Sequence, residues 1–108
     1  IFSGGDNVDL TQEQYDILIS WMERYLVPTH SITSKVDTSD IRKAFMDSYI
    51  HGFYLDNDTI NKAMLELGYH ASNFKNDPYL HFNVSYQSPA LREYRRLVSN
   101  QSTFGMYE

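Results

Sequence analysis

The most constraining feature of this chain is the order of three patterns between Asp37 and Tyr86. Two segments with helical spacing, 37–52 and 56–68, each begin at polar residues that can cap a helix and approach a glycine at their end. Aspartate and serine satisfy the unpaired amide groups at a helix start, and glycine accepts the left-handed conformation that ends a helix. The third pattern alternates apolar and more polar residues over 79–86, which predicts a strand.

A further helix is predicted before these patterns, over residues 11–26. Its apolar residues recur at helical spacing, and Thr11 with Gln14 forms a capping-box pair. This helix should stop before Pro28, because the residue preceding proline avoids helical geometry. The polar and β-branched segment 29–36 is predicted as a loop or a short edge strand.

The remaining segments complete the predicted topology. Residues 70–75 are expected to pair with the alternating strand across a turn at Asn76-Asp77-Pro78. Ser88-Pro89 opens a last helix, with serine as its cap and proline in its first position. We therefore predict an α+β, mostly helical chain, a winged helix-turn-helix with an added N-terminal helix and a C-terminal helix. Residues 1–98 would form one domain and 99–108 a flexible tail.

Composition narrows the functional classes. The chain has 108 residues, a net charge of −5, nine Tyr, six Phe and no Cys, which suits a small packed domain without disulfides. No apolar run is long enough to cross a bilayer, so no membrane partner is expected. The first residues lack the pattern of a signal peptide, and we expect a cytoplasmic location.

No catalytic, cofactor-binding or metal-binding residues are predicted. The four histidines, at positions 30, 51, 70 and 81, lack metal-ligand spacing, although His70 and His81 could approach each other across the hairpin. The acidic pairs lie at predicted helix starts, where capping explains them. The chain also lacks a nucleophile elbow and a phosphate-binding loop. We therefore expect neither an enzyme nor a small-molecule substrate.

One surface is predicted to contact duplex DNA. The second helix of a helix-turn-helix presents its side chains to the major groove. Asparagine can bond adenine there, and lysine can reach guanine or phosphate. We expect contacts from this helix, from the hairpin turn and from the preceding helix. The predicted nucleic-acid-binding residues are Asn57, Thr59, Asn61, Lys62, Lys75, Arg42 and Lys43.

A family resemblance covers residues 39–86, about half of the chain. It rests on Ser39-Asp40, the aromatic residues Phe45 and Tyr49, the Leu67-Gly68-Tyr69 run and Phe82. In these features the stretch resembles the small winged-helix domain at the C-terminus of phage and plasmid primase-helicases, a family similar to the poxvirus enzyme. The resemblance implies a DNA-binding module associated with replication or regulation in a phage or another mobile element.

Protein binding on the same fold is the alternative. The net negative charge opposes attraction to phosphate, so DNA contact would depend on a local basic face. Tyrosine is abundant here and is favoured at protein interfaces. In this hypothesis the first helix would pack through Ile17 and Trp21 on a protein partner or on a second copy of the chain.

Overall fold

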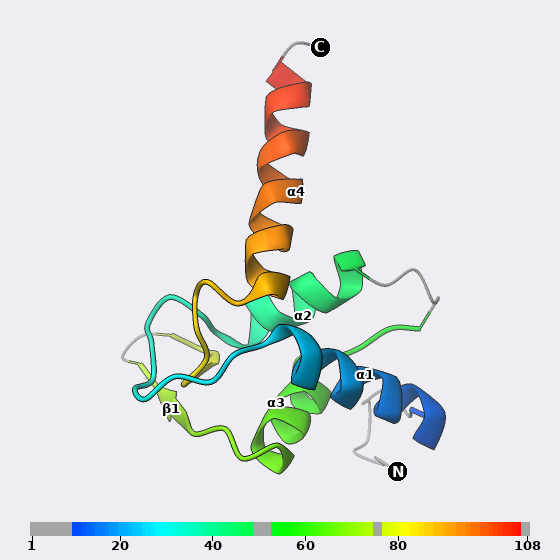
Figure 1. Cartoon of the computed structure of the whole chain (residues 1–108), viewed down its shortest axis with the longest axis vertical. Helices are drawn as coiled ribbons and strands as arrows, with labels where there is room; N and C mark the ends of the chain where they lie inside the picture. Colours follow the sequence, from blue (N-terminus) through cyan, green and yellow to red (C-terminus); the bar gives the residue numbers. More distant parts are fainter. Residues whose placement is uncertain (1–9, 49–52, 75–76, 107–108) are drawn as a thin grey trace.

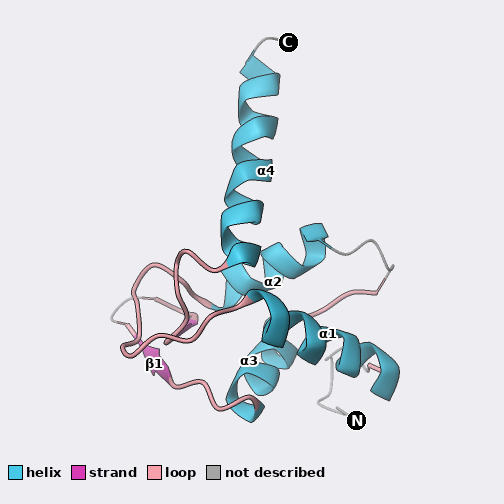
Figure 2. Cartoon of the chain, viewed as in Figure 1, coloured by secondary structure: helices cyan, strands magenta, loops and turns pink. Residues whose placement is uncertain are grey.

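The computed structural model describes residues 10–48, 53–74 and 77–106, with side chains as far as Ser99. Within these residues the fold is α+β and mostly helical, with four helices and a two-stranded antiparallel sheet (Figure 1 and Figure 2). The elements are α1 (Gln12–Tyr25), α2 (Thr38–Ser48), α3 (Asn57–Glu66), β1 (Ala71–Asn73), β2 (Leu80–Phe82) and α4 (Pro89–Met106). The predicted order of four helices and a hairpin is confirmed.

The helix starts follow the predicted local chemistry. At α1, the Gln14 amide donates to Thr11 Oγ1 at 3.1 Å and the Thr11 amide donates to Gln14 Oε1 at 3.0 Å, which completes a capping box. At α2, the Asp40 amide donates to Asp37 Oδ1 at 3.0 Å. At α3, Asp56 accepts from the amide of the third helical residue. The predicted end of α2 near Gly52 lies outside the described residues.

Gly68 ends α3 in the left-handed conformation, with a φ of +94°. Its amide donates to the Leu65 carbonyl at 3.0 Å, and the Tyr69 amide donates to the Met64 carbonyl at 3.1 Å. This pair of bonds is a Schellman motif, which turns the chain sharply out of the helix. The turn sends residues 69–71 toward β1 and leaves Tyr69 beside the end of the helix.

The core is built from one face of each helix together with β2. Trp21, 1% exposed, packs edge-on against Phe45, with ring centroids 5.1 Å apart and an interplanar angle of 83°. The expectation that Trp21 would face a partner is therefore wrong, because α2 covers the indole. The largest fully buried apolar side chains are Trp21, Phe45, Phe82, Leu18, Met22, Ile41, Leu55, Ile60 and Met64.

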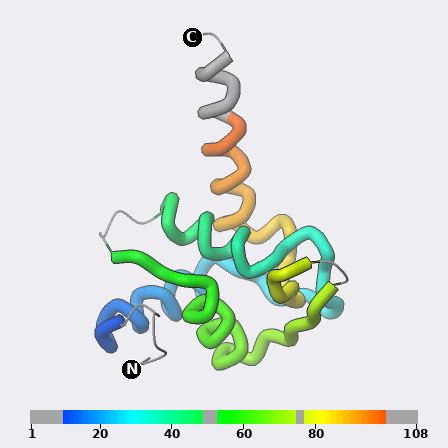
Figure 3. Tube along the Cα trace, turned by 180° about the vertical axis from the view of Figure 1, so that it is seen from behind, coloured from blue at the N-terminus to red at the C-terminus, as the bar shows by residue number. Residues whose placement is uncertain are grey.

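The segment between α1 and α2, residues 27–37, lies along β2 and is called the strap below. Of the two forms predicted for residues 29–36, it takes the loop and not the short edge strand. Isolated antiparallel bridges join it to the hairpin strand near both ends, between Pro28 and Val84 and between Asp37 and His81. Figure 1 and Figure 3 both show the strap beside the hairpin.

Apolar and more polar residues alternate over 79–86, but buried and exposed residues do not. The strap explains the difference. The strand itself is only Leu80–Phe82, paired in antiparallel register with Ala71–Asn73. His81 is 3% exposed and Asn83 is 8% exposed, although both occupy the positions expected to face solvent. Their side chains bond carbonyl groups of the strap, so both faces of this strand are covered.

Helix α4 packs against α2 over its first turns and then projects away from the rest of the molecule (Figure 1). It begins at Pro89 as predicted, but the Ser88 hydroxyl accepts from the Val27 amide at 2.9 Å. The helix continues to Met106, through most of the predicted tail. The radius of gyration, 14.4 Å, exceeds the value of about 13 Å expected for this length, which is consistent with the projection.

Candidate functional site

Two predicted DNA contacts on α3 are turned toward the protein. Thr59 is 2% exposed, and its hydroxyl donates to Asp56 Oδ1 at 2.6 Å. The same carboxylate oxygen accepts from the Thr59 amide at 2.8 Å, so this threonine completes the helix cap. Asn57 is partly buried, and its Oδ1 atom is buried without a hydrogen-bond partner among the described residues. Thr59 cannot reach a groove without breaking the start of α3.

Asn61 is also held by a neighbouring helix. Thr38, fully buried at the start of α2, directs its hydroxyl to Asn61 Oδ1 at 2.5 Å and to the Leu80 carbonyl at 3.3 Å. These contacts join α2, α3 and β2 at one point. The Asn61 amide group is therefore oriented by the fold, with its oxygen turned inward.

Lys62 is exposed but paired. Its Nζ atom lies 2.9 Å from Glu66 Oε2, one helical turn further along, and 6.0 Å from the centroid of the Tyr15 ring. The Tyr15 hydroxyl donates to the other oxygen of the same carboxylate. The hydrogen bond from Tyr15, followed by that from Lys62, lowers the pKa of Glu66. Burial, followed by the hydrogen bond to Glu66, raises the pKa of Tyr15. This trio links α1 to α3.

Of the remaining predicted contacts, Arg42 and Lys43 lie on α2, and Arg42 is engaged within the fold. Arg42 donates from Nε to the Leu55 carbonyl at 2.6 Å, and its guanidinium lies 4.9 Å from the centroid of the Tyr54 ring. Lys43 is exposed on α2. Lys75 lies outside the described residues.

The outer face of α3 is consequently mixed rather than basic. Its exposed side chains are those of Asp58, Lys62, Leu65 and Glu66. The two carboxylates outnumber the single lysine, and Leu65 is 51% exposed. A net negative face does not attract the phosphate backbone.

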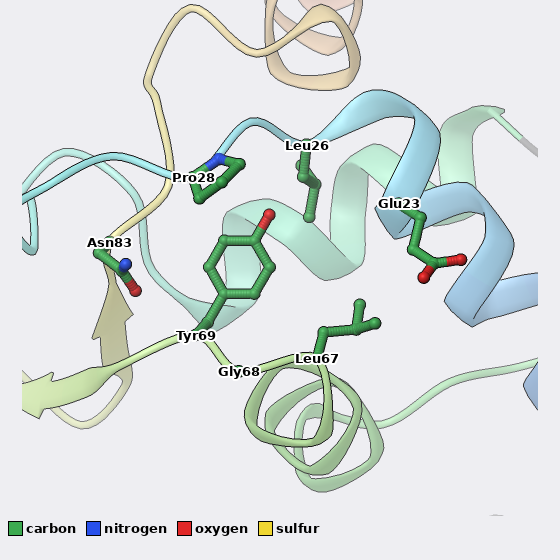
Figure 4. Close-up of a pocket in the computed structure, with 7 residues that line it drawn as sticks. All are labelled: Glu23, Leu26, Pro28, Leu67, Gly68, Tyr69 and Asn83. Atoms are coloured by element: carbon green, nitrogen blue, oxygen red, sulfur yellow. The ribbon is translucent and has the colours of Figure 1, made fainter.

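A hollow opens between the C-terminal end of α1 and the segment that follows α3 (Figure 4). We call it the α1–α3 hollow. Its volume is about 360 Å³, and it is lined by Glu23, Leu26, Pro28, Leu67, Gly68, Tyr69 and Asn83. Figure 4 shows the Tyr69 ring between these two segments, with its hydroxyl directed toward the space between Leu26 and Pro28. The lining combines apolar side chains from Leu26, Leu67 and Tyr69 with polar groups, so the hollow could accept an aliphatic or aromatic side chain beside a polar one.

The hollow has one acidic lining residue, and the helix that carries it is acidic. Glu23 is exposed at its edge, and Glu13 and Asp16 are exposed on the same helix, with Arg24 as the only exposed cation of α1. Burial raises the pKa of Tyr69, so its hydroxyl stays neutral and can donate a hydrogen bond across the physiological range. The hollow therefore combines an apolar floor, a neutral donor and a negative edge.

A cluster of potential metal ligands lies elsewhere, where the hairpin turn meets the strap. One atom from each of Asp37, Asp77 and His81 lies within 4.8 Å of the other two. The sequence did not point to this cluster, because Asp37 is distant from His81 along the chain and Asp77 was interpreted only as part of the turn. The Asp-x-x-x-His spacing across the proline turn is the signal that would have found its second half.

Two cationic side chains lie near the aromatic ring of Tyr86, which follows β2 in the chain. Arg95 of α4 lies 3.8 Å and Lys35 of the strap 5.3 Å from the ring centroid. Arg95 also donates to the Tyr86 carbonyl at 2.7 Å. Both cations lie within the range of a cation–π contact, and Arg95 is already engaged by the Tyr86 carbonyl.

Comparison with known proteins identifies no relative for this chain. No family model matches it, and neither a curated protein nor a solved structure is significantly similar. No helix within the described residues has the length and apolar character needed to span a membrane.

Proposed function

We propose that this chain is a protein-interaction domain of winged-helix type, and that it holds its partner at the α1–α3 hollow. The observation that carries the proposal is the hollow itself, a concave site with apolar and polar lining residues beside an acidic helix. Support for the winged-helix assignment comes from the element order and from the two bridges that set the strap beside β2. In that arrangement the strap would take the place of the first strand of the wing.

The chemistry of the hollow suggests the class of partner. Leu26, Leu67 and Tyr69 offer an apolar floor, which fits one apolar side chain of a peptide segment. Glu23 at the rim and the exposed acids of α1 favour lysine or arginine on either side of that anchor. We therefore infer a segment with one aromatic or aliphatic anchor flanked by basic residues.

A peptide-display selection against the whole chain tests this proposal. Enriched peptides should share the anchor and the basic flanks, and amide chemical shifts on binding should change around Tyr69 and Leu26. Replacing Glu23 with lysine should weaken binding about 3- to 10-fold, because a rim charge that favours the ligand becomes one that repels it. The matched control is Asp47→Lys, an equal charge reversal on α2 at an exposed position outside the hollow.

Two outcomes would contradict the proposal. One is a selection that enriches nothing or maps to another surface. The other is equal binding by the Glu23→Lys and Asp47→Lys chains. Sedimentation of the isolated chain at high concentration distinguishes self-association from binding of a different protein. Only self-association would raise the measured mass.

Duplex DNA binding is the second candidate, favoured by the winged-helix element order and by the exposure of Lys43 and Lys62. It predicts retardation of a DNA duplex at low salt, weakened by Lys62→Glu and Lys75→Glu. Variants that retard DNA as well as the unchanged chain, or no retardation at any salt concentration, would exclude this use of the α3 face.

A further inference from the structure

His81 lies at the centre of the cluster where the hairpin turn meets the strap. It is 3% exposed, while Asp37 at the start of α2 and Asp77 in the β1–β2 turn are partly exposed. Asp77 and His81 belong to the same hairpin, and Asp37 comes from a distant segment that meets them only in the folded chain. This cluster does not contribute to the α1–α3 hollow, so an inference about it stands apart from the proposed function.

The hydrogen-bond partners of the His81 ring are both acceptors. Nδ1 lies 3.2 Å from the Thr33 carbonyl oxygen, and Nε2 lies 2.7 Å from Asp77 Oδ2. Because a carbonyl oxygen only accepts, the Nδ1 contact is a hydrogen bond in the tautomer that carries its proton on Nδ1. In the neutral ring Nε2 is then a bare lone pair that faces a carboxylate oxygen. In that tautomer either a proton or a metal ion between the two acceptors would remove their repulsion.

We propose that Asp37, Asp77 and His81 bind a zinc ion. Imidazole nitrogen combined with carboxylate oxygen suits Zn²⁺, and three protein ligands leave its fourth position to water. The Nδ1–H bond to a backbone carbonyl is the arrangement that orients metal-binding histidines through their other nitrogen.

The carboxylates are also positioned by bonds outside the cluster. Asp77 accepts from the Tyr79 amide at 2.9 Å through Oδ1, and Asp37 accepts from the Asp40 amide at 3.0 Å through Oδ1. In a tetrahedral site ligand atoms lie about 3.4 Å apart, as follows from zinc–ligand distances of about 2.1 Å. The Nε2 and Oδ2 atoms would therefore separate by less than about 1 Å to admit the ion. The ion would join the hairpin turn to the strap and to the start of α2.

Zinc titration of the untagged chain, after removal of metal with a chelator, tests the proposal. ZnCl₂ should bind with one equivalent per chain by calorimetry and raise the melting temperature, because a ligand that binds only the folded state stabilises it. MgCl₂ at the same concentration should do neither, since Mg²⁺ prefers sites made only of oxygen. Nitrogen NMR of His81 should show a single proton on the ring, at Nδ1, in the zinc-loaded chain.

Variants assign the ligands. Asp77→Asn, at a partly exposed turn position, should weaken zinc binding at least 10-fold, and His81→Gln should abolish it. His70→Gln is the matched control, because His70 is exposed and lies outside the cluster. If His81→Gln fails to fold, Asp77→Asn and the NMR measurement still decide the question. Absence of stoichiometric binding, equal binding by Asp77→Asn, or two protons on the His81 ring with zinc present would overturn the proposal.

Discussion

Asn83 offers the sharpest test of how the strap, the hairpin and the hollow depend on one another. Its Nδ2 donates to the Thr29 carbonyl at 3.0 Å, and its Oδ1 accepts from the His70 amide at 2.6 Å. One side chain therefore bonds backbone groups on both sides of β2. The Asn83→Ala substitution removes both bonds and leaves the backbone otherwise unchanged.

The expected loss follows from the two groups left without a partner. A hydrogen bond contributes about 1 kcal/mol net, and a buried group that loses its partner costs about 1–3 kcal/mol. Both bonds are partly buried rather than fully buried, so the lower end of this range applies. We expect the free energy of unfolding to fall by about 2–3 kcal/mol, which corresponds to about 10–20 °C in melting temperature.

Urea unfolding followed by tryptophan fluorescence measures this loss, because Trp21 is the only tryptophan of the chain and lies in the core. Asn73→Ala is the matched control, since Asn73 is an exposed residue of β1. It should change the free energy of unfolding by less than about 0.5 kcal/mol, as is usual for surface sites. A loss at Asn83 no larger than that at Asn73 would refute the reasoning that this side chain holds the strap.

Other substitutions test the core, the α1–α3 contact and the end of α3. Trp21→Ala removes the ring that packs edge-on against Phe45 and should lower the free energy of unfolding by about 3–5 kcal/mol in the same urea assay; a loss below 1 kcal/mol would contradict its burial. Tyr15→Phe should lower it by about 0.5–1 kcal/mol at pH 7, a value reduced because the Glu66 side chain is 49% exposed. The pKa of Glu66 is lowered on folding, so its contribution is present above the ordinary glutamate pKa and is lost as the pH falls through the lower folded value. The difference between the unchanged and Tyr15→Phe chains should therefore shrink in acid, and a pH-independent difference would contradict the contact. Gly68→Ala should lower the free energy of unfolding by about 1–2 kcal/mol, because φ is +94° and a Cβ meets no atom within 4 Å, which leaves backbone strain as the only penalty; an unchanged stability would contradict it.

The helices were predictable because their signals are local. The capping box at Thr11 and Gln14, the cap at Asp56 and the glycine stop at Gly68 all involve residues within one turn of the chain. Such contacts form in the same way whatever the rest of the molecule does. The hairpin was also predicted, and its β1 strand falls within the expected segment 70–75.

The candidate site was less predictable because side-chain direction depends on neighbours distant in sequence. Thr59 and Asn61 are polar residues of α3 and were therefore predicted to be available to DNA. In the structure Thr59 completes the helix cap, and Asn61 accepts a hydrogen bond from Thr38. The α1–α3 hollow brings together three separate segments, and no spacing in the sequence marks it. In the cluster around His81, the spacing of Asp77 and His81 is visible in the sequence, but the approach of Asp37 is not.

The sequence by itself determined where the helices begin, how α1 and α3 are capped and where the hairpin lies, because these features depend on contacts between near neighbours. Only the tertiary structure decided which polar residues remain available to a ligand. The strap buries His81 and Asn83 on what a period-2 pattern marks as the solvent side, because its carbonyl groups supply the partners that water would otherwise provide. A helix face predicted to read DNA is likewise turned partly inward by contacts that α1 and α2 bring to it.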